Sequence, residues 1–200
     1  YVHQTEMYEY NTSGKNTFPS FCPRTNEERI QNVPNAMKKL TGIEVIITRK
    51  QEGTSTTFVQ NKEQFLVCGR TTVWTEPSKD SAHYFEVEKK YDISNKMKEL
   101  AKNICIQGET TGPKINGNRM NRKENDYEVF NIWNTESQTY QDYDTVTETC
   151  VAIGLKQVPL VFRGILPENM SELIEKMNPD MLPKQYKTVQ AQTADKGELV

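Results

Sequence analysis

The apolar residues of this sequence come in short runs, which limits the chain to small, loop-rich elements. The longest runs lie around residues 43–47 and 158–162, far below the roughly 18 consecutive apolar residues of a membrane span. Both are rich in β-branched or aromatic residues, which indicates buried strands. With 35% hydrophobic residues and a mean hydropathy of −0.76, the sequence predicts a polar surface and no membrane partner.

The size and charge of the chain restrict its organisation and its partners. Its 200 residues suit one domain, and 25 basic against 27 acidic residues give a net charge of −2. This charge excludes a strongly cationic nucleic-acid coat but allows a local basic groove. The chain begins at Tyr1 and carries no signal peptide, so we expect a monomeric, cytoplasmic fragment of a longer protein.

Cysteine and histidine usage narrows the possible chemistry. The cysteines are spaced 37 to 46 residues apart without a CxxC pair, and the chain has only two histidines. This argues against structural zinc and against a histidine-based catalytic triad, so any chemistry must rest on Lys, Arg and carboxylates. We expect reduced thiols, with Cys68 and Cys105 as core residues inside strands.

The periodicity of the sequence predicts a mixed α+β fold with mostly antiparallel strands. The expected strands are 43–48, 54–59, 65–68, 103–109, 127–133 and 158–162, of which 54–59 and 65–68 form a hairpin. The expected helices are 26–32 (opened by a capping box from Thr25 to Glu28), 34–42, 93–102, one within 144–156, and 167–177. We expect residues 1–20, 76–81, 110–125 and 179–200 to be irregular.

The most informative stretch is residues 48–55, TRKQEGTS, at the end of the strand expected over 43–48. If Lys50 and Glu52 continue that strand, they share one face and point into the same pocket. Gly53 then lets the backbone turn close to a ligand. The pattern suits a nucleophilic amine beside a carboxylate that holds a metal ion or its waters. The alternative interpretation is a solvent-exposed Lys–Glu pair at a strand end.

Further motifs accompany KQEG in a fixed order between about residues 15 and 165. They are FPSF at 18–21 with RTNEERIQN at 24–32, LVCGRT at 66–71, IQGE at 106–109 with the glycines that follow it, and VFNI at 129–132. Together they resemble the motifs of ATP-dependent RNA ligases, in the RNA ligase 2-like and Deinococcus/Naegleria-type branch of the covalent nucleotidyltransferases. KQEG corresponds to the K-x-D/E-G nucleotide-acceptor motif of that family.

The resemblance implies a fold and a reaction. The fold is an incomplete ligase adenylation domain (ATP-grasp-like), with antiparallel sheets flanked by helices. It comprises an irregular lead-in over 1–17, a motif-bearing core over about 18–165, and a helix and tail over 166–200. In the reaction, Lys50 attacks ATP to form lysyl-AMP, AMP passes to an RNA 5′-phosphate, and a 3′-hydroxyl seals the strand. The implied partners are RNA ends, and the implied cofactors are ATP and Mg²⁺ or Mn²⁺.

The resemblance also implies individual binding roles. Arg70 contacts the phosphate or the ribose, Glu109 accepts a hydrogen bond from a ribose hydroxyl, and Phe130 stacks on adenine. The peptide groups of Arg49 and Gln51 read the adenine edge. The implied nucleotide-binding residues are therefore Arg49, Glu52, Gly53, Arg70, Glu109 and Phe130, with Glu52 also touching the metal through water. The basic residues of the loop after Glu109 are RNA-contact candidates, or alternatively belong to a solvated loop: Lys114, Arg119, Arg122 and Lys123.

The sequence departs from the family pattern in ways that leave a second function open. Glu52 stands where aspartate is usual, and Gln51 where an apolar residue is common. The later E-G-x-V motif is not found, because the order at Gly197 and Glu198 is reversed. The final K-x-K motif is absent too, since Lys96-Met97-Lys98 lies on an expected helix before the IQGE motif. We therefore expect the 200-residue chain to be weakly active or inactive. The alternative is a degenerate, non-catalytic module that binds nucleotide or RNA ends.

Overall fold

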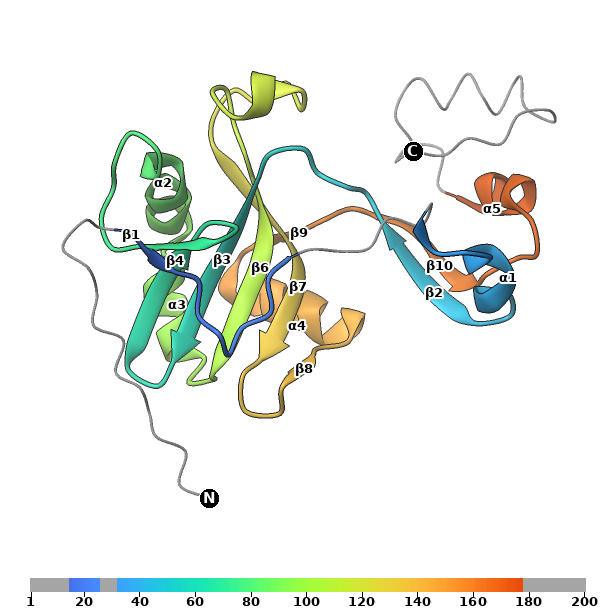
Figure 1. Ribbon diagram of the computed structural model, residues 1–200, viewed down its shortest axis with the longest axis horizontal. Helices are drawn as coiled ribbons and strands as arrows, with labels where there is room; N and C mark the ends of the chain where they lie inside the picture. Colours follow the sequence, from blue (N-terminus) through green and yellow to red (C-terminus); the bar gives the residue numbers. More distant parts are fainter. Residues whose placement is uncertain (1–14, 26–31, 178–200) are drawn as a thin grey trace. The chain divides into compact units, whose positions relative to one another are not determined.

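The computed structural model describes residues 15–25 and 32–177 of the chain. The chain divides into two compact units (Figure 1). Unit 1 comprises residues 1–25 and 51–157, and unit 2 comprises residues 26–50 and 158–200. The helix expected over 26–32, apart from Asn32, and the tail after residue 179 lie outside the described residues.

Unit 1 is built on an eight-stranded sheet with the strand order β1-β5-β4-β3-β6-β7-β8 and with β9 beside β7. Only the β7–β9 pair is parallel, so the expected α+β class with mostly antiparallel strands is confirmed. The expectation that residues 1–20 are irregular was wrong at β1, which pairs with β5. The strands are β1 (Lys15–Thr17), β3 (Thr54–Asn61), β4 (Gln64–Cys68), β5 (Thr72–Trp74), β6 (Ile104–Thr111), β7 (Asp126–Asn134), β8 (Thr139–Tyr140) and β9 (Lys156–Gln157).

Three helices lie on one side of this sheet (Figure 1): α2 (Ala82–Tyr91), α3 (Ile93–Glu99) and α4 (Tyr143–Ile153). Helix α4 begins after Asp142, whose side chain accepts a hydrogen bond from the Thr145 N–H, and ends at Gly154 with φ +65°. Helices α3 and α4 confirm the sequence prediction. Helix α2 was not predicted, because only Tyr84 and Val87 are buried along its ten residues, which leaves a weak apolar period.

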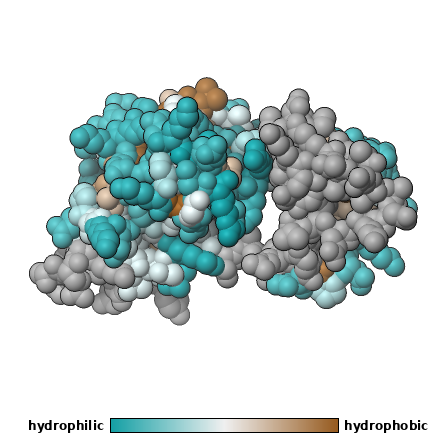
Figure 2. All heavy atoms as spheres, turned by 90° about the horizontal axis from the view of Figure 1, so that it is seen from above, coloured by the Kyte–Doolittle hydropathy of each residue, from teal (hydrophilic) through white to brown (hydrophobic). Residues whose placement is uncertain are grey.

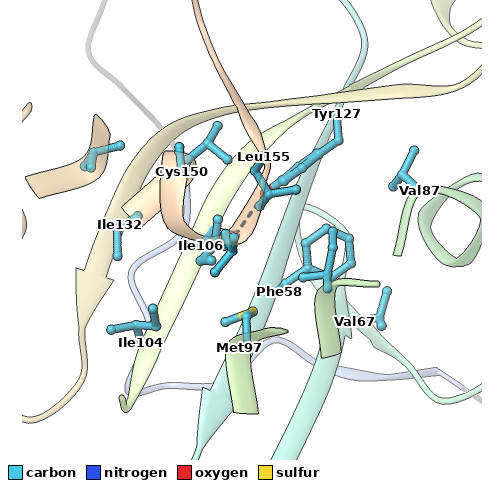
Figure 3. Close-up of a cluster of buried hydrophobic side chains, with 14 of the residues drawn as sticks. Phe58, Val67, Val87, Met97, Ile104, Ile106, Tyr127, Ile132, Cys150 and Leu155 are labelled. Carbon is cyan, nitrogen blue, oxygen red and sulfur yellow. Dashed lines mark hydrogen bonds between the residues drawn. The ribbon is translucent and has the colours of Figure 1, made fainter. Parts of the chain in front are cut away.

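The main core lies between these helices and the sheet (Figure 3). Phe58 on β3 and Ile106 on β6 are fully buried there against Met97 of α3. Tyr127 of β7 is also fully buried, and its hydroxyl donates to the carbonyl oxygen of Ile106 at 3.1 Å, so its one polar atom is satisfied. The surface over this core is mainly hydrophilic on the face that Figure 2 shows, as the composition predicts.

Residues 18–25 cross the other face of the sheet and partly cover it (Figure 1). The indole of Trp133 donates to the carbonyl oxygen of Phe21 at 3.1 Å, and the amide of Gln107 donates to that of Pro23 at 2.6 Å. Beneath this segment lies a second cluster of buried side chains that includes Cys68 and Cys105. Both thiols are fully buried and unbridged, which confirms their predicted place in the core.

Unit 2 is a small two-stranded sheet with two short helices. Its elements are β2 (Glu44–Thr48), β10 (Leu160–Ile165), α1 (Ala36–Leu40) and α5 (Met170–Lys176). The expectation of buried strands was right for only one face of this sheet. Val45 and Ile47 pack on the small core, but Ile46 between them is 38% exposed, because a two-stranded sheet buries only one set of alternate side chains.

The other expectations for unit 2 differ from the structure mainly in their boundaries. Helix α5 begins at Met170 rather than Pro167, because the side chain of Asn169 caps it by accepting the N–H of Glu172. Within the described ranges 15–25 and 32–177, no helix is both long and apolar enough to span a membrane.

Candidate functional site

The structure joins two residues that the sequence motifs single out, Gly53 and Glu109. The N–H of Gly53, just before β3, donates to Oε1 of Glu109, near the end of β6, at 2.9 Å. A Cβ added to Gly53 would overlap the carbonyl oxygen of Thr110 and lie 2.9 Å from Cγ2 of Thr111. Only glycine fits this close approach of two backbones, so the KQEG segment has a fixed anchor on β6.

The expected strand arrangement of Lys50 and Glu52 was wrong. Strand β2 ends at Thr48 and β3 begins at Thr54, so residues 49–52 form an irregular connection without the two-residue alternation of a strand. Lys50 is exposed and is the last residue of unit 2 before the chain enters unit 1. Glu52 forms an exposed ion pair with Arg119, 2.7 Å between Oε1 and Nη1. Its carboxylate is therefore engaged by the loop over residues 112–125.

Arg49 and Gln51, on either side of Lys50, have different environments. The N–H of Arg49 donates to the carbonyl oxygen of Pro159 at 2.8 Å within unit 2. That donor is engaged by the protein itself. Gln51 is buried in unit 1, and its Oε1 has no hydrogen-bond partner among the described residues. An unpartnered buried amide oxygen of this kind is available to a donor on a ligand.

Three polar side chains form a row across neighbouring strands. Ser55 of β3 lies opposite Glu109 of β6, which in turn lies opposite Glu128 of β7. Side chains directly opposite each other in an antiparallel sheet point to the same face, with Cβ atoms about 5 Å apart. The row lies on the face that residues 18–25 partly cover, and the hydroxyls of Thr25 and Ser55 share a 2.6 Å hydrogen bond.

Phe130 lies two residues after Glu128 on β7, on the same face and next to a β-bulge. Gln107 of β6 pairs with Asn131, but the next residue, Gly108, pairs with Val129, so Phe130 is the extra residue between them. Val129 and Ile132 both belong to the main core, while Phe130 is half-buried outside it. Alternation along β7 thus places Phe130 on the side of Glu128, and the extra residue brings Ile132 back into the core.

Arg70 lies at the same end of the sheet. It follows β4, whose last residue Cys68 pairs with Thr57, so the chain beyond β4 runs toward the start of β3. Arg70 itself is exposed. Nearby, the hydroxyls of Thr54 and Tyr84 lie 3.2 Å apart. Burial, against the hydrogen bond from Thr54, raises the pKa of Tyr84, so this hydroxyl stays protonated at neutral pH.

The loop over residues 112–125 carries the four basic residues singled out for RNA contact, and the structure divides them. Arg119 pairs with Glu52, and Nη2 of Arg122 lies 2.5 Å from Oε1 of Glu128. The other two, Lys114 and Lys123, are exposed. The arginines therefore hold the loop to carboxylates of the protein, which the sequence did not predict.

Two contributors were missed by sequence reasoning. Asn116 donates through Nδ2 to the carbonyl oxygen of Gly53, so the backbone N–H and C=O of Gly53 are both held by side chains. Glu128 joins the polar row beside Glu109. Neither has a local signal, because each contact depends on segments far apart in the sequence. Within residues 15–25 and 32–177, no three His, Cys, Asp or Glu side chains are grouped to hold a metal ion.

One pocket of unit 1 lies away from this row. It is lined by Phe65, Trp74 and Phe85 with Glu88, between β4, β5 and α2. Leu66 and Val67 of the LVCGRT segment line it as well, but none of the residues of the polar row does.

Comparisons with known proteins identify the family and the fold. The family model for RNA ligase matches residues 43–198. Among solved structures, a lysine-to-alanine mutant of Naegleria gruberi RNA ligase with ATP and Mn has a TM-score of 0.72 and 24% identity, covering 80% of this chain and 47% of that one. The same ligase with PPi has a TM-score of 0.72 and 24% identity, covering 80% of this chain and 48% of that one. An apo aspartate-to-alanine mutant of that ligase has a TM-score of 0.73 and 24% identity, covering 80% of this chain and 48% of that one.

These matches confirm the expected fold of the RNA ligase adenylation domain. The chain spans about half the length of the solved ligases that it matches. No curated protein has a significantly similar sequence. The family model covers most of the chain, including the KQEG, LVCGRT, IQGE and VFNI segments, and the chain therefore belongs to the RNA ligase family.

Proposed function

We propose that this chain carries out the adenylylation step of an ATP-dependent RNA ligase. Nζ of Lys50 attacks the α-phosphorus of ATP, the new N–P bond forms as the bond to pyrophosphate breaks, and the amine loses its proton. AMP then passes to the 5′-phosphate of an RNA end, and a 3′-hydroxyl displaces AMP to seal the strand. The biological task is the joining or repair of RNA ends.

The observation that carries this proposal is the 2.9 Å hydrogen bond from the Gly53 N–H to Glu109. It ties the segment that bears the nucleophile to the face that bears Glu109 and Phe130. Gly53 is only three positions after Lys50, and three residues of extended chain span at most about 11 Å. The covalent chain therefore keeps the amine within reach of a nucleotide that binds on this face. The exposure of Lys50 leaves it accessible, and its desolvation comes with nucleotide binding.

The other site residues take roles that suit their chemistry. Glu109 accepts a hydrogen bond from a ribose hydroxyl. Phe130, which lies outside the core, stacks on the base. The planar guanidinium of Arg70 donates hydrogen bonds to phosphate oxygens. Solved structures of the Naegleria ligase contain ATP and Mn, and we propose Mn²⁺ or Mg²⁺ as the cofactor here. Charge neutralisation at the phosphates is what a bound divalent ion would add.

The test is intact-protein mass measured after incubation of the full gene product with ATP and a divalent metal. We expect a covalent AMP adduct that is lost in Lys50→Ala. The matched control, Lys79→Ala, removes an exposed lysine from the loop before α2 and should keep the adduct. Absence of the adduct from the unmodified full gene product would refute catalysis, and an adduct that survives in Lys50→Ala would refute the assigned nucleophile.

A second function is favoured by one observation, the ion pair that engages Glu52 with Arg119 in a motif already altered at Gln51. In this alternative the chain binds nucleotide or RNA ends without forming an adduct. Protection from thermal unfolding by ATP, with no change in mass, distinguishes it from the ligase. Incubation with GTP in place of ATP tests for a guanylyl-transferring enzyme of the same superfamily. Such an enzyme forms its adduct with GTP, unlike the ligase or the non-catalytic module.

A further inference from the structure

Glu128 is a buried carboxylate with one oxygen unused. It lies on β7, and its side chain is 9% exposed. Oε1 accepts from Nη2 of Arg122 at 2.5 Å, whereas Oε2 is buried and has no hydrogen-bond partner within the described ranges. Nε of Arg122 is likewise buried and unpartnered in the described part of the chain. The pair thus retains one acceptor and one donor in a place where leaving them unsatisfied is costly.

Glu128 lies on the face of the sheet that carries the proposed nucleotide site. Glu128 lies directly opposite Glu109, on the same face of the sheet and about 5 Å away between Cβ atoms. Two carboxylates placed opposite each other repel, and the guanidinium of Arg122 offsets that repulsion. A purely structural role does not require this arrangement, since an apolar pair at these positions would avoid the burial of charge.

The level of Glu128 along the strands indicates which part of a nucleotide it meets. Phe130 lies two residues farther along β7, beyond the row formed by Glu109 and Glu128. A base stacked on Phe130 leaves the sugar at the level of that row. A carboxylate oxygen accepts hydrogen bonds from hydroxyls and repels phosphates. We infer that Oε2 of Glu128 accepts one ribose hydroxyl beside Glu109, which makes Glu128 a further specificity residue. This inference rests on the proposed function.

The experiment measures nucleotide binding in a Lys50→Ala background, where no covalent adduct forms. Dissociation constants are determined for ATP, 2′-deoxy-ATP and 3′-deoxy-ATP, with and without Glu128→Gln. We expect Glu128→Gln to weaken ATP binding on the order of tenfold, because a hydrogen bond to a charged group is lost. The same substitution should leave unchanged the affinity for the analogue that lacks the contacted hydroxyl. Glu128→Gln should weaken the binding of the other deoxy analogue as much as it weakens the binding of ATP.

Two further variants complete the test. Glu124→Gln removes a carboxylate of the same loop that pairs with Lys90 at 2.8 Å in solvent, and it should change none of the three affinities. If Glu128→Gln does not fold, the double variant Glu128→Leu with Arg122→Met replaces the buried pair by apolar side chains of similar size. It should show the same selective loss.

The outcomes separate this inference from the function on which it rests. Equal losses for all three nucleotides, or no loss for any, would overturn the role of Glu128 and leave the proposed function standing. Failure of the Lys50→Ala protein to bind any nucleotide would overturn the proposed function, and this inference with it.

Discussion

At the scale of single residues, Gly53 is the position where the site tolerates least change. An added Cβ meets the backbone oxygen of Thr110, which cannot move without disrupting the β3–β6 pairing. We predict that Gly53→Ala displaces the KQEG segment and lowers the adenylylation rate on the order of 100-fold, as expected for misplacement by about 1 Å. The measurement is the rate of adduct formation, followed by intact-protein mass.

The control for this prediction separates misplacement from loss of stability. Gly154 ends α4 with φ +65°, and Gly154→Ala costs about 1 kcal/mol of folding free energy through backbone strain alone. It should lower the melting temperature without slowing adduct formation. A Gly53→Ala protein that is adenylylated at the normal rate would show that the contact with β6 does not position the nucleophile.

At the scale of elements, Asp126 joins α2 and β9 to the start of β7. It accepts hydrogen bonds from the hydroxyl of Tyr91 and, at 2.6 Å, from Nζ of Lys156. Burial opposes ionisation of this carboxyl, but the hydrogen bonds from Lys156, Tyr91 and the Tyr127 N–H outweigh it and lower the pKa of Asp126. A lowered pKa stabilises the fold above the unfolded value of about 3.9, and that stability is lost as the pH falls through the folded value.

We therefore predict a pH-dependent cost of Asp126→Asn. At pH 7 the substitution should lower the free energy of unfolding by about 1–2 kcal/mol, since a charge-assisted hydrogen bond is lost but the half-exposed Lys156 is solvated instead. The difference from the unmodified protein should shrink as the pH falls below about 4. Denaturant titrations over a series of pH values measure it. Glu172→Gln, which removes an exposed pair with Lys176, should cost less than about 0.5 kcal/mol. A difference that does not change with pH would contradict this account.

Individual elements also differ in how well the sequence predicts them. The hairpin of β3 and β4 was predictable because alternation along each strand is a local pattern. The bulge at Phe130 was not, since an extra residue in β7 is defined only by its pairing with β6. For the site, the sequence named Gly53 and Glu109, which the structure brings together. It placed Lys50 and Glu52 on a shared strand face that does not exist, because two-residue alternation cannot be assumed beyond the end of a strand. The functional roles of these residues stay predictions.

At the scale of the whole molecule, a net charge of −2 leaves little general attraction for RNA, so binding must depend on local basic residues. Arg119 and Arg122 are already paired with Glu52 and Glu128, which leaves the exposed Lys114 and Lys123 as the cations of that loop with no carboxylate partner within the described ranges. The loop should therefore contribute about two phosphate contacts rather than four. This number can be measured through the salt dependence of binding, because each contact releases counterions from the RNA.

We predict that Lys114→Ala combined with Lys123→Ala weakens binding of single-stranded RNA and reduces the slope of log affinity against log salt concentration by about 1.4, at roughly 0.7 per contact. Fluorescence anisotropy with a labelled 5′-phosphorylated RNA over a salt series gives the slope. The matched control, Lys38→Ala with Lys39→Ala, removes the same charge from exposed positions on α1 and should leave the slope nearly unchanged. Equal slopes for the loop variant and the unmodified protein would mean that the loop makes no phosphate contact. A change near 2.8 in a variant that lacks all four basic residues would instead show that RNA displaces Glu52 and Glu128 from their arginines.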